Sequence, residues 1–222
     1  MIKIIEPLTA TEGFESAIRG MRNPWTSWHR CDSSYNIYGD YEIGEDDLAL
    51  MKKLVKAGTD HRKFLRMITV WCDIIAPLYW WKEFDTYKIG TVANSCSTMQ
   101  CIANKEFTLD DFSCEKLINS MGMKIQELQK RVRISPMQSM LTTLECLNQY
   151  RELYLETENK KYWWQMIQLL PSSYNQKRTV MLNYEVLMNM YKARKNHKLD
   201  EWREFCKWVE KLPYMKELLE VA

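Results

Sequence analysis

The sequence predicts an α/β (α+β) fold in which a short central sheet is flanked by long helices. β-branched segments typical of strands lie in the first half, at residues 1–7 and 67–75, whereas apolar residues at helical spacing dominate the second half. Only 7 Gly and 6 Pro occur among 222 residues, which favours long regular elements over tight turns. At this length we expect a single domain over residues 1–222.

The first predicted strand is MIKIIEP, residues 1–7, which ends in a proline. A helix is predicted near TEGFESAIRGM, residues 11–21, with Thr9 and Thr11 as candidate N-caps. Residues 24–45 are rich in Trp, Tyr, Ser and Asp and are predicted to form an irregular loop.

Three further elements are predicted before the middle of the chain. Residues 46–56 place apolar residues at helical spacing with lysines between them, and Gly58 then ends the helix. Residues 67–75 (MITVWCDII) have the β-branched composition of a buried strand. The aromatic stretch LYWWKEF, residues 78–84, is predicted to begin a helix.

The second half is predicted to be mainly helical. Thr108 and the acid three residues later have the spacing of a capping box. Helical periodicity then runs through four stretches: CEKLINSMGMKIQELQKRVR (114–133), MQSMLTTLECLNQYRELYLET (137–157), TVMLNYEVLMNMYKARK (179–195) and DEWREFCKWVEKL (200–212).

Composition narrows the classes of partner and compartment. The formal net charge is +2, from 31 basic and 29 acidic residues that are scattered, so we expect no nucleic-acid partner. No window of 18 apolar residues occurs, so we expect no membrane span. The 7 cysteines lack metal-site spacing and only 3 histidines are present, which predicts reduced thiols and no zinc site. We therefore expect a cytoplasmic protein.

Two tryptophan pairs, Trp80-Trp81 and Trp163-Trp164, invite a cofactor interpretation. Adjacent residues cannot share one helix face, so we expect one member of each pair to face the core and the other to lie at an interface. Packing is therefore favoured over ligand stacking.

The stretch TYKIGTVANSCSTM, residues 86–99, gathers small polar groups directly after the aromatic segment. Turns would explain this composition, and so would a phosphate or nucleotide site. Cys96 has no histidine near it in the sequence, so we do not expect it to act as a nucleophile.

The order of elements around this stretch resembles the flavin-dependent thymidylate synthases. That family has a strand ending in proline, an aromatic helix, and then Arg-His-Arg followed by Asn-x-x-Ser. Here a strand and an aromatic helix precede Asn94 and Ser97, which match the Asn-x-x-Ser part.

A second stretch is similar to the family's C-terminal motif. Leu-Pro is followed about a dozen residues later by Asn-x-x-x-Leu-Met-Asn, an Arg five residues on, and then His, Trp and an acid. The matching positions are Leu170, Pro171, Asn183, Leu187, Met188, Asn189, Arg194, His197, Glu201 and Trp202.

The resemblance implies roles for seven residues. Arg194 would lie against the pyrimidine and stabilise negative charge that develops on the ring, as the catalytic group. It implies cofactor contacts for Lys88, Asn94 and Asn189. It also implies substrate contacts, which would come from Ser95, Ser97, Arg194 and His197.

The resemblance also implies a reaction and an assembly. Reduced FAD would deliver hydride to a dUMP-like pyrimidine deoxynucleotide, methylenetetrahydrofolate would supply the carbon for C5, and NADPH would reduce the flavin. The family is a homotetramer whose sites are built from several subunits.

The chain departs from the family at charged positions, and these departures keep other interpretations open. Thr86-Tyr87-Lys88 stands where the family has Arg-His-Arg, and Met99 stands where it has a nucleotide-gripping arginine. An alternative is therefore a nucleotide-binding protein without flavin chemistry that sequesters or senses a nucleotide, a role suited to a phage or mobile element. A helical interaction protein is a third interpretation.

Each proposed site residue also has a plain structural explanation. Arg194 would complement a helix dipole or form an ion pair. Lys88, two residues before Gly90, would be a solvated turn residue. Residues 95–98 would cap a helix.

Overall fold

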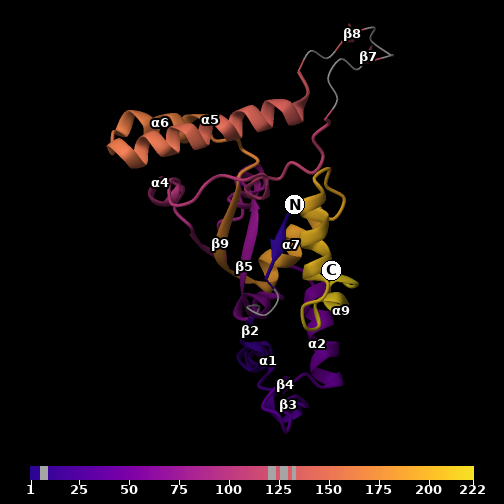
Figure 1. Cartoon of the computed structure of the whole chain (residues 1–222). Coiled ribbons are helices and arrows are strands. Elements are labelled where there is room, and N and C mark those ends of the chain that lie inside the picture. The colour runs from indigo at the N-terminus through magenta and orange to yellow at the C-terminus, as the bar shows by residue number, and fades with distance from the viewer. Residues whose placement is uncertain (6–9, 120–123, 126–129, 132–133) are drawn as a thin grey trace. The chain divides into compact units, whose positions relative to one another are not determined.

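The computed structural model describes residues 1–5, 10–119, 124–125, 130–131 and 134–222 (Figure 1). Contacts divide the chain into two compact units. Unit 1 contains residue 1, residues 75–82 and residues 95–177, and unit 2 contains residues 2–74, 83–94 and 178–222.

The predicted fold class is confirmed, because the described residues combine long helices with a small sheet. The main sheet has the strand order β1-β5-β9-β6, and β2 pairs antiparallel with β5. The described strands are β1 (Lys3–Ile4), β2 (Ala10–Glu12), β3 (Ser34–Tyr35), β4 (Tyr41–Glu42), β5 (Thr69–Pro77), β6 (Thr91–Ser95), β7 (Lys124–Ile125), β8 (Lys130–Arg131) and β9 (Asn175–Asn183).

The helices account for most of the remaining regular structure. The described α-helices are α1 (Phe14–Arg22), α2 (Glu45–Lys56), α3 (Leu78–Phe84), α4 (Thr98–Cys101), α5 (Pro136–Thr157), α6 (Lys160–Leu169), α7 (Tyr184–Arg194), α8 (Asp200–Val209) and α9 (Met215–Leu219). Short 3₁₀ helices are η2 (Asn23–Trp25), η3 (Trp28–Arg30), η4 (Lys63–Met67) and η5 (Leu109–Asp111).

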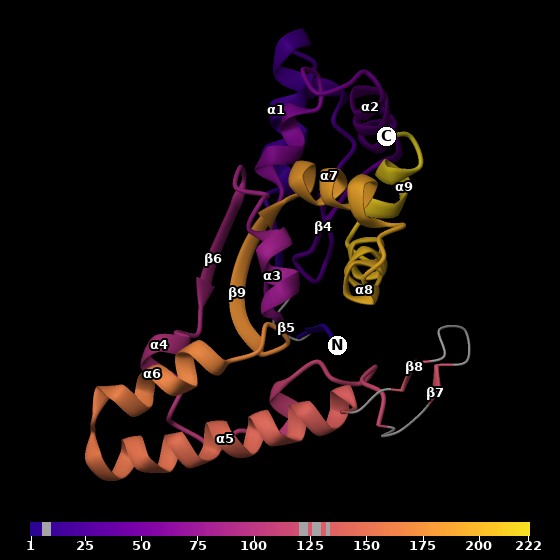
Figure 2. The same cartoon turned by 90° about the horizontal axis from the view of Figure 1, so that it is seen from above.

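Unit 2 is built around α7. Helices α1 and α7 each contact η4, α8 contacts α7, and α9 contacts α2 near the C-terminus (Figure 2). Fully buried side chains of the core include Ile18, Met51, Leu65, Leu187 and Phe205. This packing fixes the faces of α7 on which the candidate site residues lie.

Residues 24–45, predicted to form an irregular loop, contain η2, η3 and the paired strands β3 and β4, and Asp47 anchors this segment. Its buried carboxylate accepts hydrogen bonds from Arg22 Nε at 2.6 Å and from Ser33 Oγ at 2.7 Å, and it also accepts from Cys31 Sγ. Burial alone would raise the pKa of Asp47, but these donors and the Arg22 charge lower it below its ordinary value. One carboxylate thus joins the loop to α1 and α2.

Unit 1 is dominated by the helical hairpin of α5 and α6, which lie side by side (Figures 1 and 2). Ser135 caps α5 by accepting from Gln138 N, and Asn159 caps α6 by accepting from Lys161 N. Met140, Leu147 and Met166 of the hairpin form one apolar cluster with Ile102, Ala103, Phe107 and Phe112.

Most predicted elements are confirmed, with ends that shift by one to a few residues. The helix before the irregular loop and the strand before the aromatic helix correspond to α1 and β5. The strand predicted over residues 1–7 corresponds to β1 (Lys3–Ile4), and residues 6 and 7 lie outside the described residues. The predicted helices at 46–56, 78–84, 137–157 and 200–212 correspond to α2, α3, α5 and α8. Thr108 does form a capping box, although it caps the short η5.

The helix predicted over residues 179–195 begins too early. Residues up to Asn183 belong to β9, where burial alternates so that Val180 and Leu182 face inward. Asn183 then caps α7 by accepting a hydrogen bond from Val186 N at 2.9 Å. The prediction extended the helix too far because apolar residues continue without a break from β9 into α7.

Two further predictions are corrected. Residues 114–119 are not helical, and the described parts of 120–133 form the paired strands β7 and β8, while the rest of that predicted helix lies outside the described residues. Thr11 belongs to β2 and does not cap α1, whose N-cap is Gly13. Thr9 lies outside the described residues.

The prediction for the first tryptophan pair is wrong. Trp80 and Trp81 are both buried and meet edge to face, because α3 is enclosed on more than one side. Trp163 is half-buried and Trp164 is exposed, which matches the division expected for the second pair. In the described part of the chain, no helix is both long and apolar enough to cross a membrane.

Candidate functional site

Arg194, the residue expected to contact a pyrimidine, is held inside unit 2 by an ion pair. Its Nη1 donates to Glu83 Oε2 at 2.7 Å, and its Nε donates to Tyr87 Oη at 2.9 Å. The side chains of Arg194 and Glu83 are only 19% and 33% exposed. Partial burial strengthens such a charged hydrogen bond relative to one in water.

Aromatic rings enclose this ion pair. The guanidinium carbon lies 4.8 Å from the centroid of the Trp202 ring and 5.6 Å from that of Tyr87. Trp202 also donates its indole N–H to the same Glu83 oxygen at 2.7 Å. Cation–π contacts of this kind add roughly 0.5–2 kcal/mol.

His197 completes the surroundings of Glu83. Its Nδ1 accepts from Leu199 N at 3.2 Å, which assigns the proton of the neutral ring to Nε2, and Nε2 lies 3.4 Å from Glu83 Oε2. Three side chains thus converge on one carboxylate oxygen. This arrangement matches the explanation of Arg194 as a member of an ion pair. The contact of Arg194 with a pyrimidine stays a prediction.

Asn189 lies elsewhere on α7 and has basic neighbours. Its side-chain oxygen accepts from Arg62 Nη2 at 3.2 Å. Arg62 and Arg66 both bind the carboxylate of Glu185, which lies one helical turn before Asn189. The predicted cofactor contact is therefore part of an ionic network.

Lys88 lies on an exposed turn between α3 and β6. The turn is fixed by Gly90, whose φ of +77° suits glycine and whose carbonyl accepts from Asn183 N at 3.2 Å. The cavity beside Lys88 has a volume of about 180 Å³ and is lined by Phe84, Asp85, Tyr87, Lys88, Thr91 and Ala93.

The remaining predicted residues surround the end of β6. Asn94 and Ser95 are exposed on that strand. Ser97 caps α4, where its Oγ accepts from Gln100 N at 3.3 Å. The helix-cap explanation of this stretch is confirmed, and the ligand roles of these residues stay predictions.

Among the seven predicted residues, the structure joins Arg194 and His197 through Glu83. Sequence reasoning missed Glu83 and Tyr87 as their partners, and it missed Arg62 and Glu185 beside Asn189. No local spacing indicated these partners, since Glu83 and Arg194 are 111 positions apart. The sequence shows that Glu185 and Asn189 are four residues apart on one helix. It does not show that Arg62 contacts both of them.

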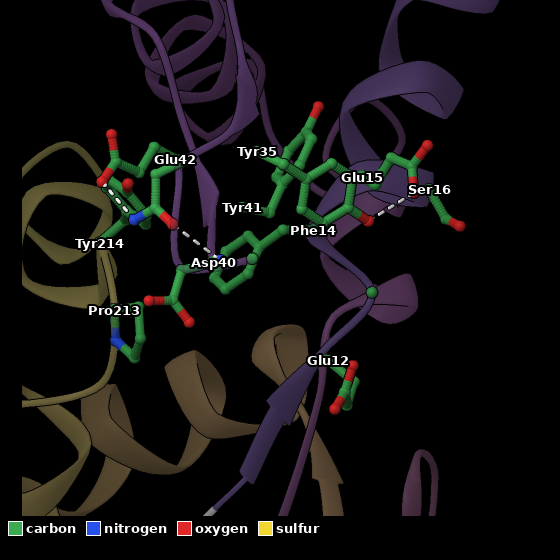
Figure 3. Close-up of a pocket in the computed structure, with 13 residues that line it drawn as sticks. Glu12, Phe14, Glu15, Ser16, Tyr35, Asp40, Tyr41, Glu42, Pro213 and Tyr214 are labelled. Atoms are coloured by element: carbon green, nitrogen blue, oxygen red, sulfur yellow. Dashed lines mark hydrogen bonds between the residues drawn. The ribbon is translucent and has the colours of Figure 1, made fainter.

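A larger cavity of about 680 Å³ in unit 2 has acidic walls (Figure 3). Its lining includes Glu12, Glu15, Asp40 and Glu42 and contains neither Lys nor Arg. Tyr35 Oη donates to Glu15 at 2.9 Å within it. An excess of carboxylates repels phosphate, so this cavity does not suit a nucleotide.

Within a single copy of the chain, the described residues around Lys88 enclose less space than FAD needs. The cavity beside Lys88 is smaller than the ~300–1,000 Å³ of ordinary ligand pockets, and FAD is a large ligand. Asn189 already accepts a hydrogen bond from Arg62. A flavin pocket at these positions would therefore need walls from outside the described residues of unit 2.

Comparisons with solved structures identify the fold. No protein-family model and no curated protein sequence matches this chain. The crystal structure of thymidylate synthase X (ThyX) from Helicobacter pylori with FAD and dUMP matches with a TM-score of 0.67 and 16% sequence identity. The match covers 99% of this chain and 97% of that one.

A UMP/dUMP methylase, PolB from Streptomyces cacaoi bound with 5-Br dUMP, matches with a TM-score of 0.62 and 10% identity. That match covers 100% of this chain and 93% of that one. The chain thus shares the fold of flavin-dependent thymidylate synthases, as the motif resemblance implied, although few positions are identical.

Proposed function

We propose that this chain binds a pyrimidine nucleoside monophosphate of the uracil type. The observation that carries the proposal is the fold, which covers nearly the whole length of two proteins solved with dUMP, 5-Br dUMP or 5-Br UMP. In unit 2, Arg62 and Arg66 at η4 and the basic residues Lys192 and Arg194 of α7 supply the positive charge that a phosphate needs.

The geometry favours nucleotide binding without flavin chemistry. Glu83 holds Nη1 of Arg194, and the cavity that a single copy forms beside Lys88 is smaller than FAD. A protein of this kind would sequester or sense the nucleotide. Its recognition would rest on the phosphate and on the hydrogen-bonding edge of the base.

Transfer of a methyl or related one-carbon group to C5 is the second candidate function. It is favoured because both neighbours are named for such enzymes, a thymidylate synthase and a methylase. The candidate would require FAD, methylenetetrahydrofolate and NADPH. In it, Arg194 would have to turn from Glu83 before it could stabilise negative charge on the pyrimidine ring.

We also propose that the chain forms a homo-oligomer, a tetramer by the resemblance. Lys88, Asn94 and Ser95 are exposed, whereas ligand sites commonly bury most of the ligand. A second copy would supply the missing walls. Sedimentation analysis of the purified protein tests this, and a monomer at all concentrations would contradict it.

Calorimetric titration with dUMP tests nucleotide binding, and Arg194→Lys tests the role of the guanidinium. Lysine keeps the charge but loses the planar pair of donors, so we expect dUMP binding to weaken about tenfold. Arg19→Lys makes the same change at an exposed position on α1 and should leave binding unchanged. Equal affinities of both variants and the unmodified protein would remove Arg194 from the site.

The visible absorption spectrum, before and after FAD is added, separates the two candidates. If the protein is colourless, does not bind added FAD and does bind dUMP, the result supports nucleotide binding without flavin chemistry. A protein-bound flavin band would favour the transferase, and release of tritium from 5-labelled dUMP would then measure its activity.

A further inference from the structure

The face of α7 that carries Glu185 and Asn189 also carries Lys192. Residues at i, i+4 and i+7 of a helix lie on one face, so these three side chains follow one another along α7. Helix α7 contacts η4, and Arg62 and Arg66 reach Glu185 from that side. We call the group of Arg62, Arg66, Glu185, Asn189 and Lys192 the α7–η4 face.

Contacts within the α7–η4 face hold the arginines in place. Arg62 donates its Nε to Glu185 Oε1 at 3.4 Å and its Nη2 to Asn189 Oδ1 at 3.2 Å. Arg66 donates to both oxygens of Glu185. Arg62 and Glu185 are only 10% and 12% exposed, so the arrangement is built into the fold.

Positive charge on this face exceeds what the protein itself neutralises. Arg62 and Arg66 share the carboxylate of Glu185, and Asp60 adds a weaker attraction to Arg66, whereas no ion pair is formed by Lys192 among the described residues. Among the described residues, neither the Lys192 ammonium nor Nη1 of Arg62 has a hydrogen-bond partner. The side chain of Lys192 is exposed, so a ligand can reach it.

The pKa of Lys192 is consistent with an excess of positive charge on the α7–η4 face. Partial burial lowers the pKa of Lys192, and repulsion from Arg62 and Lys195 lowers it further. Among the residues that the structure describes, no carboxylate offsets these effects. An anion placed here would relieve the repulsion.

We propose that the α7–η4 face binds a phosphate monoester, held by Lys192 and Arg62, with Asn189 orienting the arginine. Arginine and lysine are the usual ligands of phosphate oxygens, and the second arginine keeps Glu185 occupied. The identity of the ligand as a nucleotide rests on the proposed function, whereas the binding of phosphate itself does not.

Lys192→Met tests the proposal, because it removes the free ammonium at an exposed position and leaves the Arg62–Glu185 pair intact. Lys216→Met, at an exposed lysine on α9, makes the same change in net charge and serves as the control. We expect Lys192→Met to weaken dUMP binding roughly tenfold, the effect of losing one charged hydrogen bond, and the control to leave it unchanged. Binding of deoxyuridine, which lacks phosphate, should be equal in both variants.

Inorganic phosphate separates this proposal from the proposed function. In a nuclear magnetic resonance titration, we expect phosphate to shift the backbone amide signals of Asn189 and Lys192, and not in Lys192→Met. Phosphate binding without any preference for dUMP would contradict the nucleotide function and leave the anion site standing. Binding of dUMP that is equally tight in Lys192→Met, or the absence of any shift with phosphate, would overturn the anion site.

Discussion

Two clusters on unit 2 use similar residues in different ways. Around Arg194, one arginine meets one carboxylate and two aromatic rings, so its charge is neutralised and enclosed. On the α7–η4 face, two arginines share one carboxylate and Lys192 is left over. The comparison teaches that an arginine matching a motif can already be paired within the protein, so that a ligand has to displace its partner, whereas a cation that the fold leaves unneutralised is better placed to bind a ligand.

The largest expected effect comes from Glu83→Ala. This change removes the acceptor of Arg194 and Trp202 and leaves their donors unpaired in a partly buried site. We expect the free energy of unfolding to fall by about 1–3 kcal/mol, measured by urea denaturation. The exposed Glu204, which pairs with Lys207, gives the control Glu204→Ala, for which we expect a loss of less than about 0.5 kcal/mol.

Equal losses in these two glutamate variants would contradict the view that the Arg194 cluster is a structural ion pair. Calorimetry of Glu83→Gln sharpens the comparison further, because glutamine keeps an acceptor oxygen but removes the charge. If dUMP binding strengthens in Glu83→Gln, Glu83 competes with the ligand for Arg194.

A comparable or slightly smaller effect is expected for Gly90→Ala. A Cβ on Gly90 would lie 2.1 Å from Asn183 Nδ2, and Asn183 caps the helix that carries both clusters. The loss should be about 1–3 kcal/mol by the same denaturation measurement. Gly39→Ala is the control, since Gly39 also has positive φ but no atom within 4 Å of its Cβ position. If Gly90→Ala lowers the free energy of unfolding no more than Gly39→Ala does, the close approach to Asn183 contributes nothing, and backbone strain alone explains the loss.

The smallest expected effect is a pH dependence at Lys192. The folded-state pKa lies below the ordinary value of 10.5, so the unfolded state binds more protons between these two pKa values. The charged lysine therefore destabilises the ligand-free protein at neutral pH, and this penalty disappears as the pH rises towards 10.5. Lys192→Met should have a slightly higher melting temperature at pH 7.

The melting-temperature difference should shrink in alkaline buffer, where Lys192 in the unmodified protein loses its proton. Lys216→Met again provides the control for the change in net charge. A difference that stays constant with pH, or a lower melting temperature of Lys192→Met at pH 7, would contradict excess positive charge on the α7–η4 face.

Local patterns in the sequence predicted much of the fold. Periodicity located α2, α5 and α8, and β-branched composition located β5. The helix prediction was wrong at residues 179–183, because the alternating burial of β9 is followed without a break by the apolar spacing of α7. A single window cannot separate two periods that meet without a break.

The site was predicted less completely, because its contacts are long-range. The motif resemblance selected Arg194 and His197, which do meet at one carboxylate. Glu83 approaches from a different part of the chain, and Arg62 reaches Glu185 across 123 positions. Sequence spacing carries no information about such pairs, since they depend on how η4 and α3 pack.

A crystal structure of the protein with saturating dUMP tests the central claim most directly. The account predicts that the nucleotide binds with its phosphate oxygens within hydrogen-bonding distance of Lys192 Nζ and Arg62 Nη1. A structure in which dUMP is absent, or in which its phosphate lies away from the α7–η4 face, would contradict the account.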